Sequence, residues 1–154
     1  MTESLDATDW AILDEVQRDG RIAFTELARR VNLSASATTE RVRRLEAAEV
    51  ITGYRAEVDL ERTGHVVLAV VRLKYPGTRH EPLRQLLGER PEILECLRTT
   101  GDDCYLLKVA ATSMGHLEEI VDALAQFGST TTNLVLSRTL PFRGPQEPRA
   151  NTVR

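Results

Sequence analysis

The chain has 154 residues, a length that suits one moderate domain or two small ones. Hydrophobic residues make up 42% and charged residues 28%, and the longest apolar run, residues 66–71, is far too short to span a bilayer. The first ten residues lack the basic and apolar regions of a secretion signal. Two irregularly spaced cysteines do not form a disulfide framework, so we expect a cytoplasmic protein with no membrane partner.

The net charge of −3 conceals a local basic cluster. Residues 1–60 carry eight arginines and no lysine against twelve acidic residues, whereas residues 29–44 hold five arginines and a single glutamate. Clustering of this kind is the electrostatic footprint of a nucleic-acid-binding protein. A solvated helix face has the same composition, so the charge pattern alone leaves both interpretations open.

Three helices are predicted in the first fifty residues. The first begins after the capping residue Asp6 and ends at Gly20, and the second covers the apolar positions of residues 24–31. Asn32 tolerates the positive φ of a tight turn, and Ser34 is a good N-cap for the third helix. The inward face of that helix is predicted at positions 38, 42 and 45, which are spaced i, i+4 and i+7.

This order of helices is typical of a helix-turn-helix whose third helix enters the major groove of double-stranded DNA. Residues 50–59 are predicted to form a short β-ribbon, the wing. Short hydroxyl side chains near the start of the third helix suit base edges, and the arginines suit bases or phosphates. We expect DNA contacts from nine residues: Arg29, Arg30, Ser34, Ser36, Thr39, Glu40, Arg41, Arg43 and Arg44.

The second half of the chain alternates strands and helices. Strands are predicted over residues 65–75, 93–99, 104–112 and 132–140, with helices around residues 83–88 and 117–124. This order, βαββαβ, predicts a ferredoxin-like sandwich with both helices on one face of the sheet. The other face carries apolar residues such as Leu68 and Leu106, so a covering partner is expected. A homodimer is the simplest one, and it supplies a second helix-turn-helix.

The predicted class is therefore α+β, with two domains. A winged helix-turn-helix domain occupies residues 1–59, a linker 60–64, a βαββαβ oligomerisation domain 65–140, to which the family resemblance given below adds effector binding, and a C-terminal tail 141–154.

The stretch "TTGDDCYLL", residues 99–107, gathers two carboxylates and a thiol on a glycine turn. Catalysis by Cys104 needs a base, but the three histidines are scattered and neighbouring carboxylates disfavour a thiolate. A metal site needs three or four ligands, and no histidine lies nearby in the sequence. With Thr99 facing Cys104 across the turn, a disulfide between Cys96 and Cys104 is also disfavoured. A plain structural turn and a turn beside a ligand pocket both remain open; we expect no enzyme activity, cofactor or metal.

The whole chain resembles the Lrp/AsnC (leucine-responsive, feast/famine) family of transcription regulators. The resemblance rests on an ordered set of short motifs: Leu5-Asp6-x-x-Asp9, Asp19-Gly20-Arg21, Glu26-Leu27-Ala28, Leu33-Ser34-x-Ser36, Arg41-Val42-x-x-Leu45-Glu46, Ile51-x-Gly53-Tyr54, Gly64, Thr100-Gly101-Asp102, Tyr105-Leu106-Leu107 and Gly128.

The resemblance implies a DNA-reading domain joined to a domain that dimerises and senses a small molecule, commonly an amino acid. It also implies dimers assembled into tetramers or octamers, with an effector pocket between dimers. Carried over, that pocket involves Thr100, Gly101, Asp102, Asp103, Cys104, Thr132 and Leu134.

Three positions depart from the family pattern. A thiol, Cys104, stands where the family has its second acid after the Gly-Asp turn, and Leu134 replaces a frequent threonine. Because an amino acid needs an acceptor for its ammonium and donors for its carboxylate, a more apolar ligand, or none, stays open beside an amino acid or related metabolite. Glu49 replaces a glycine at the exit of the recognition helix, which is expected to be strained or differently built.

The first hypothesis is thus a sequence-specific, effector-modulated transcription regulator. Two alternatives are a nucleoid-like architectural DNA binder, which would use the same residues with little sequence preference, and a ligand-binding module without DNA activity.

Overall fold

The computed structural model describes residues 4–102 and 104–148, which fall into two compact units. The helical unit runs to Glu57 and takes in the chain from Pro141 onward, and the α/β unit spans Val58–Leu140. No helix among the described residues is long and apolar enough to cross a membrane.

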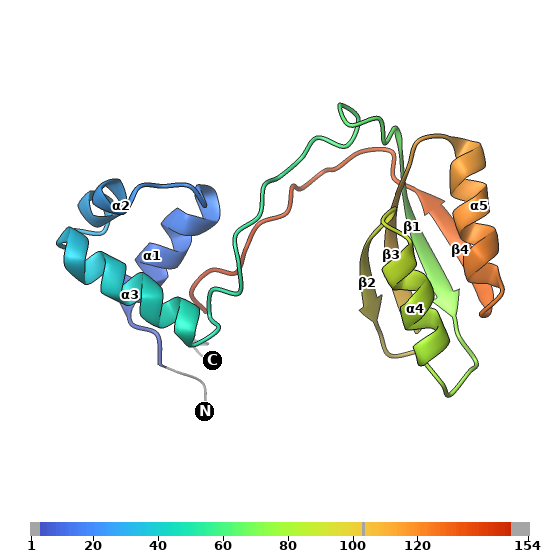
Figure 1. Cartoon of the computed structure of the whole chain (residues 1–154), viewed down its shortest axis with the longest axis horizontal. Coiled ribbons are helices and arrows are strands. Elements are labelled where there is room, and N and C mark those ends of the chain that lie inside the picture. The colour runs from blue at the N-terminus through green and yellow to red at the C-terminus, as the bar shows by residue number, and fades with distance from the viewer. Residues whose placement is uncertain (1–3, 103, 149–154) are drawn as a thin grey trace, which may run out of the picture. The chain divides into compact units, whose positions relative to one another are not determined.

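The helical unit contains the three predicted helices, α1 (Ala7–Arg18), α2 (Phe24–Arg30) and α3 (Ala35–Ala47) (Figure 1). A capping box starts α1: the Asp9 backbone N–H donates to Asp6 Oδ1 at 2.8 Å, and the Asp6 N–H donates to Asp9 Oδ2 at 3.1 Å. Ser34 caps α3 by accepting from the Ala37 N–H at 3.2 Å. Both predicted caps are confirmed.

The core of the helical unit lies where the three helices meet. Ile12, Leu27, Val42 and Leu45 are fully buried there. Thr38 is also buried, and its hydroxyl donates to the carbonyl of Ser34 at 3.0 Å, so burial leaves no unsatisfied donor. The predicted inward face of α3 is therefore confirmed.

Two residues without a glycine's freedom adopt positive φ at the ends of this motif. Asn32, in the turn before α3, has φ 55°, as predicted, and Glu49, just past α3, has φ 56°. Glu49, which departs from the glycine of the family pattern, adopts a left-handed conformation that is uncommon for a residue with a side chain.

The predicted wing is wrong as a β-ribbon. Residues 52–59 are described throughout and form no strand. The segment is held instead by Tyr54, whose hydroxyl donates to Glu46 Oε1 of α3 at 2.9 Å and whose ring lies against Gly20. Partial burial of the ring and this hydrogen bond raise the pKa of Tyr54 to about 12. Side-chain contacts of Tyr54, rather than pairing between strands, therefore hold this segment.

The α/β unit has the predicted βαββαβ order. Its elements are β1 (Val67–Lys74), α4 (Glu81–Glu89), β2 (Ile93–Arg98), β3 (Tyr105–Ala111), α5 (Met114–Ala125) and β4 (Ser129–Leu134). The strands form one antiparallel sheet in the order β2-β3-β1-β4. Leucines of α4 and α5, including Leu83, Leu117 and Leu124, pack with Val71 and Leu107 in a single core on one face of this sheet (Figure 1).

The last strand begins earlier and ends earlier than the predicted range 132–140. It begins at Ser129 because Gly128 brings the backbone close to β1: a Cβ there would lie 2.0 Å from the carbonyl oxygen of Lys74. It ends at Leu134, opposite Ala69, and one further backbone hydrogen bond follows, from the Val135 N–H to the Leu68 carbonyl at 2.8 Å. Hydrophobic residues continue beyond residue 134, but regular pairing with β1 does not.

The chain after residue 140 returns to the helical unit. Gln17 Nε2 of α1 donates to the carbonyl of Pro145 at 3.2 Å, and a Cβ at Gly144 would lie 1.4 Å from Gln17 Oε1. The sequence showed a tail but no sign of this contact, which depends on a glycine that lets the backbone approach α1.

Candidate nucleic-acid interface and effector region

Short hydroxyl side chains lie on the exposed face of α3 together with one glutamate and one arginine. Ala35, Ser36, Thr39, Glu40 and Arg43 line an open depression on this helix. Their spacing places them on the side opposite the buried positions 38, 42 and 45. The structure therefore brings together four of the nine residues predicted at the DNA.

Two of the predicted DNA-binding arginines, Arg41 and Arg44, make ion pairs within the fold. Arg41 donates to Asp9 Oδ1 at 2.8 Å and to Asp6 Oδ2 at 2.8 Å, and Arg44 donates to both oxygens of Asp9 at 2.7 Å. The Asp9 carboxylate is only 1% exposed. A buried carboxylate requires such partners, so these arginines fasten α3 to the start of α1 rather than join the exposed face of Arg43.

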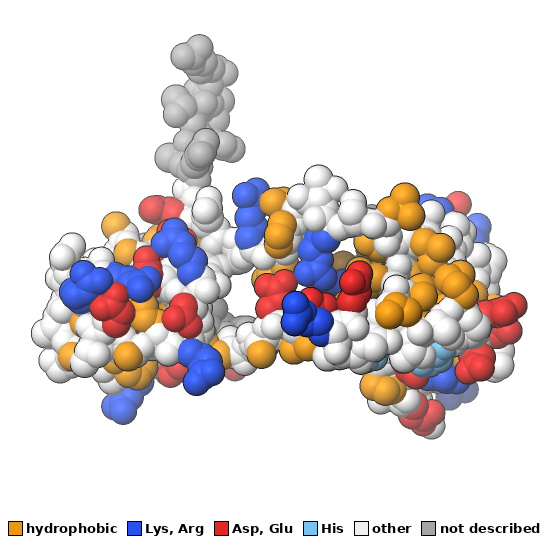
Figure 2. Space-filling model, turned by 90° about the horizontal axis from the view of Figure 1, so that it is seen from above, with side chains coloured by type: hydrophobic (Ala, Val, Ile, Leu, Met, Phe, Trp, Pro, Cys, Tyr) orange, Lys and Arg blue, Asp and Glu red, His pale blue; other side chains and the backbone are white. Residues whose placement is uncertain are grey.

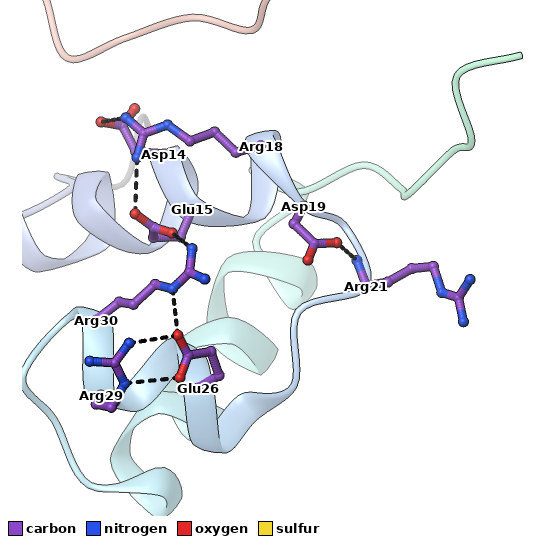
Figure 3. A network of polar contacts seen from close by, with 8 residues as sticks. All are labelled: Asp14, Glu15, Arg18, Asp19, Arg21, Glu26, Arg29 and Arg30. Atoms are coloured by element: carbon purple, nitrogen blue, oxygen red, sulfur yellow. Dashed lines mark hydrogen bonds and ion pairs between the residues drawn. The ribbon is translucent and has the colours of Figure 1, made fainter. Parts of the chain in front are cut away.

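Arg29 and Arg30 at the end of α2 are also paired with acids, as Figure 3 shows. Glu26 accepts from Arg29 at 2.8 Å and from Arg30 at 2.8 Å, and Arg30 also donates to Glu15 of α1 at 2.7 Å. Hydrogen bonds from these two guanidiniums lower the pKa of Glu26 to about 2. The acid therefore stays ionised at neutral pH and neutralises part of the local positive charge.

This pairing explains how an acidic domain contains a basic cluster. Figure 2 shows arginine and acidic side chains intermixed over the helical unit, at the left of that view. Among the described residues, Arg43 is the arginine of the 29–44 cluster that has no side-chain partner. Arg21 is a further cation whose side chain points away from the network in Figure 3, and the sequence interpretation did not single it out.

The hydroxyl groups of α3 are partly engaged within the helix. Ser34 Oγ caps the helix and lies 3.1 Å from Ser36 Oγ, and Thr39 Oγ1 donates to the carbonyl of Ala35 at 2.8 Å. Thr39 thereby keeps its lone pairs and its methyl group available to a ligand. Ser34 serves as the cap of α3.

The predicted effector turn is well defined on its described side. Gly101 has φ 99°, and the Thr99 N–H donates to the carbonyl of Cys104 at 2.9 Å, which confirms that these two residues face each other. Asp102 is exposed, with one carboxylate oxygen 3.7 Å from Lys74 Nζ at the end of β1. Thr100 is exposed in the same turn, and Asp103 lies outside the described residues.

Cys104 is held by the backbone of β1. Its sulfur accepts from the Tyr75 N–H at 3.4 Å and lies 3.6 Å from the Tyr75 carbonyl oxygen. These partners are neutral backbone groups, not a base that would generate a thiolate. Burial raises the pKa of the other thiol, Cys96, which also favours the protonated form.

The two effector residues predicted on β4 lie away from the turn. Thr132 is opposite Val71 and Leu134 is opposite Ala69, whereas the turn is beside Lys74. At about 3.4 Å per residue, these separations along the sheet are roughly 10 and 17 Å. Thr132 Oγ1 is buried and meets no hydrogen-bond partner among the described residues. One copy of the described chain does not gather the predicted effector residues into one pocket.

The histidines serve structural hydrogen bonds. His116 Nε2 lies 3.1 Å from Glu92 Oε1, and His80 Nδ1 lies 2.8 Å from the Tyr105 hydroxyl. Hydrogen bonds to the Glu92 carboxylate, from its own backbone and from His116, lower the pKa of Glu92. Within residues 4–102 and 104–148, no group of three or more His, Cys, Asp or Glu side chains could hold a metal ion.

The fold and the exposed third helix define a helix-turn-helix protein with an attached α/β domain. A model of the AsnC-type helix-turn-helix domain matches residues 5–46, and a model of the Lrp/AsnC ligand binding domain matches residues 68–145. The chain belongs to the Lrp/AsnC family of transcription regulators.

Individual relatives match over most of their length. The chain is 32% identical to the HTH-type transcriptional regulator LrpC of Bacillus subtilis over 86% of this chain and 92% of LrpC, and the LrpC structure superposes with a TM-score of 0.84 over 88% and 96% of the two chains. It is 34% identical to a proline dehydrogenase transcriptional activator of Rhodobacter capsulatus over 94% of this chain and 99% of the relative. A feast or famine regulatory protein of Mycobacterium tuberculosis complexed with L-methionine is 30% identical, with a TM-score of 0.85 over 92% of this chain and 99% of the other.

The family membership confirms the predicted function class. The chain is a helix-turn-helix transcription regulator with a small-molecule-binding type of second domain.

Proposed function

We propose that α3 of this regulator enters the major groove with Ser36, Thr39, Glu40 and Arg43 toward the bases. The observation that supports this assignment is that these four side chains line one open depression, on a helix whose arginines Arg41 and Arg44 are tied to acids. Arg43 is the strongest candidate for a guanine contact, since its donors have no partner among the described residues. Arg29 and Arg30 stay positively charged, and phosphate contacts from them compete with their ion pairs to Glu26.

The open face of the sheet supports a homodimer. On that face Leu106 of β3 lies between Leu97 of β2 and Arg72 of β1, and Leu97 is 47% exposed in a single copy. Hydrophobic side chains also stand at the surface of the α/β unit in Figure 2. A second copy of the chain covers this sheet face with the same face of its own sheet. The resulting dimer brings two recognition helices to one DNA site. Tetramers or octamers of such dimers follow the family pattern.

A small molecule, an amino acid or a related metabolite, is the proposed effector. A relative complexed with L-methionine supports the ligand class, and the Gly101 turn with Lys74 and Asp102 supplies opposite charges within this chain. Binding of such a ligand between dimers changes the spacing of half-sites through a coupling free energy of about 1–3 kcal/mol.

The test compares Arg43→Ala with Arg84→Ala, which removes the same charge from an exposed arginine of α4. The full chain is titrated with a duplex selected from a random-sequence library, and sedimentation checks that each variant keeps its assembly. Arg43→Ala is expected to weaken binding by roughly ten- to a hundredfold, the value of a lost bidentate guanine contact, while Arg84→Ala stays near wild type. Equal affinity of both variants and wild type would show that the assigned face is wrong.

A further inference from the structure

The exposed face of α3 carries an acidic residue that is not used to stabilise the fold. Glu40 shares the exposed depression of α3 with Arg43, and neither side chain has a partner among the described residues. Other acids of the helical unit are engaged: Asp9 with Arg41 and Arg44, Glu26 with Arg29 and Arg30, and Glu46 with Tyr54. Glu40 is therefore not needed to neutralise an arginine of this fold.

A carboxylate in this position carries an electrostatic cost at DNA. A major-groove surface lies between two rows of phosphates, which repel a negative side chain on any sequence. Two bases present a donor there, the N4 amino group of cytosine and the N6 amino group of adenine. The adenine donor lies between two acceptors, N7 and the thymine O4, which repel a carboxylate, whereas the cytosine donor has an acceptor on one side only. An unpaired glutamate on a groove-facing helix thus favours cytosine at the contacted position over the other bases.

Arg43 is placed to read the neighbouring base pair. It follows Glu40 by three residues, which corresponds to about 4.5 Å along the helix axis and is comparable to the ~3.4 Å step between base pairs. Guanine offers two acceptors, O6 and N7, to an arginine. The two residues i and i+3 form no ion pair with each other in the structure, so each keeps its full capacity for a base.

We infer that Glu40 and Arg43 together set the base specificity of this regulator, Arg43 donating to a guanine and Glu40 accepting from the cytosine of the same or the adjacent base pair. The inference rests on the proposed entry of α3 into the major groove. Glu40 acts as a specificity-determining residue that lowers affinity for DNA without the matching G·C pair.

The decisive variant is Glu40→Gln, which keeps the shape of the side chain and removes its charge. Glu118→Gln on the exposed side of α5 is the matched control for the charge change. Wild type, both variants and Arg43→Lys are titrated against the selected duplex, a scrambled duplex and a set of duplexes with single base-pair substitutions in one half-site. Circular dichroism checks the fold of each variant.

Glu40→Gln is expected to bind scrambled DNA about three- to tenfold more tightly, because phosphate repulsion is removed. The preference of Glu40→Gln for C·G over other base pairs should fall by about five- to a hundredfold at one position, which is the usual contribution of a base contact. Arg43→Lys should lose preference at the same or the adjacent guanine while keeping the salt dependence of binding, since the charge is retained.

Two failures can be told apart. If wild type prefers the selected duplex but Glu40→Gln keeps the wild-type preference at every position, the inference about Glu40 is overturned and the proposed function stands. If wild type binds selected and scrambled duplexes equally, the proposed function is overturned and the inference with it.

Discussion

Replacing Asp9 by asparagine removes the charge that holds the recognition helix to α1. The carboxylate is buried and accepts hydrogen bonds from Arg41, from Arg44 and from the Asp6 backbone N–H. Breaking a fully buried ion pair costs about 3–5 kcal/mol. The two arginine side chains remain 30% and 46% exposed, so solvent screens part of the interaction and we expect a loss of about 2 kcal/mol. For a unit of this size that corresponds to a melting temperature lowered by about 8–16 °C.

Trp10 makes the measurement specific to the helical unit. It is the single tryptophan of the chain, and it lies in α1 beside Asp9, so its fluorescence follows the unfolding of this unit in the full-length protein. Asp14→Asn is the matched control on the same helix, since Asp14 is 41% exposed and its oxygen lies 3.9 Å from Arg18. The control should change stability by less than about 0.5 kcal/mol. Equal melting temperatures for Asp9→Asn and Asp14→Asn would refute the structural role given to Arg41 and Arg44.

Two further predictions concern the charge network and the sheet. Because the pKa of Glu26 is lowered from 4.5 to about 2, its ion pairs stabilise the helical unit above pH 4.5, and this contribution is lost as the pH falls from 4.5 through 2. The urea midpoint followed by Trp10 fluorescence should therefore fall more steeply over this range in wild type than in Glu26→Gln, and parallel profiles would contradict the assignment. On the open face of the sheet, Leu106→Asp should convert the assembly to monomers in analytical ultracentrifugation. The control Leu136→Asp, at a leucine that is 96% exposed and lies outside the sheet, should leave the assembly unchanged. Unchanged sedimentation of Leu106→Asp would place the dimer interface elsewhere.

Local signals predicted the helices and strands well where the physics is local. The capping residues Asp6 and Ser34 and the apolar spacing of α3 define their elements within a few neighbouring residues, and the structure confirms them. The extent of β4 depended instead on its pairing with β1, which no pattern within residues 129–140 reveals. The wing failed for a similar reason: extended, β-prone residues need a partner strand, and Tyr54 anchors the segment by side-chain contacts.

The site shows the same division between local and tertiary information. Sequence spacing placed Ser36, Thr39, Glu40 and Arg43 on one exposed face, since helical geometry fixes which positions share a side. It could not show that Arg41 and Arg44 meet a carboxylate some thirty residues earlier in the chain, because that contact exists only after α1 and α3 pack. An acid such as Asp9 within an otherwise buried helix face was the signal available, since a buried charge needs a partner.

The central claim is sequence-specific DNA binding through paired recognition helices. Selection of bound duplexes from a random-sequence library by the full chain, followed by competition with scrambled DNA at two salt concentrations, tests it most directly. The account predicts an enriched pseudo-palindromic motif whose half-sites lie about one helical turn, or a multiple of it, apart, with binding that resists the competitor and weakens with salt. A library that shows no enriched motif at low salt would contradict it.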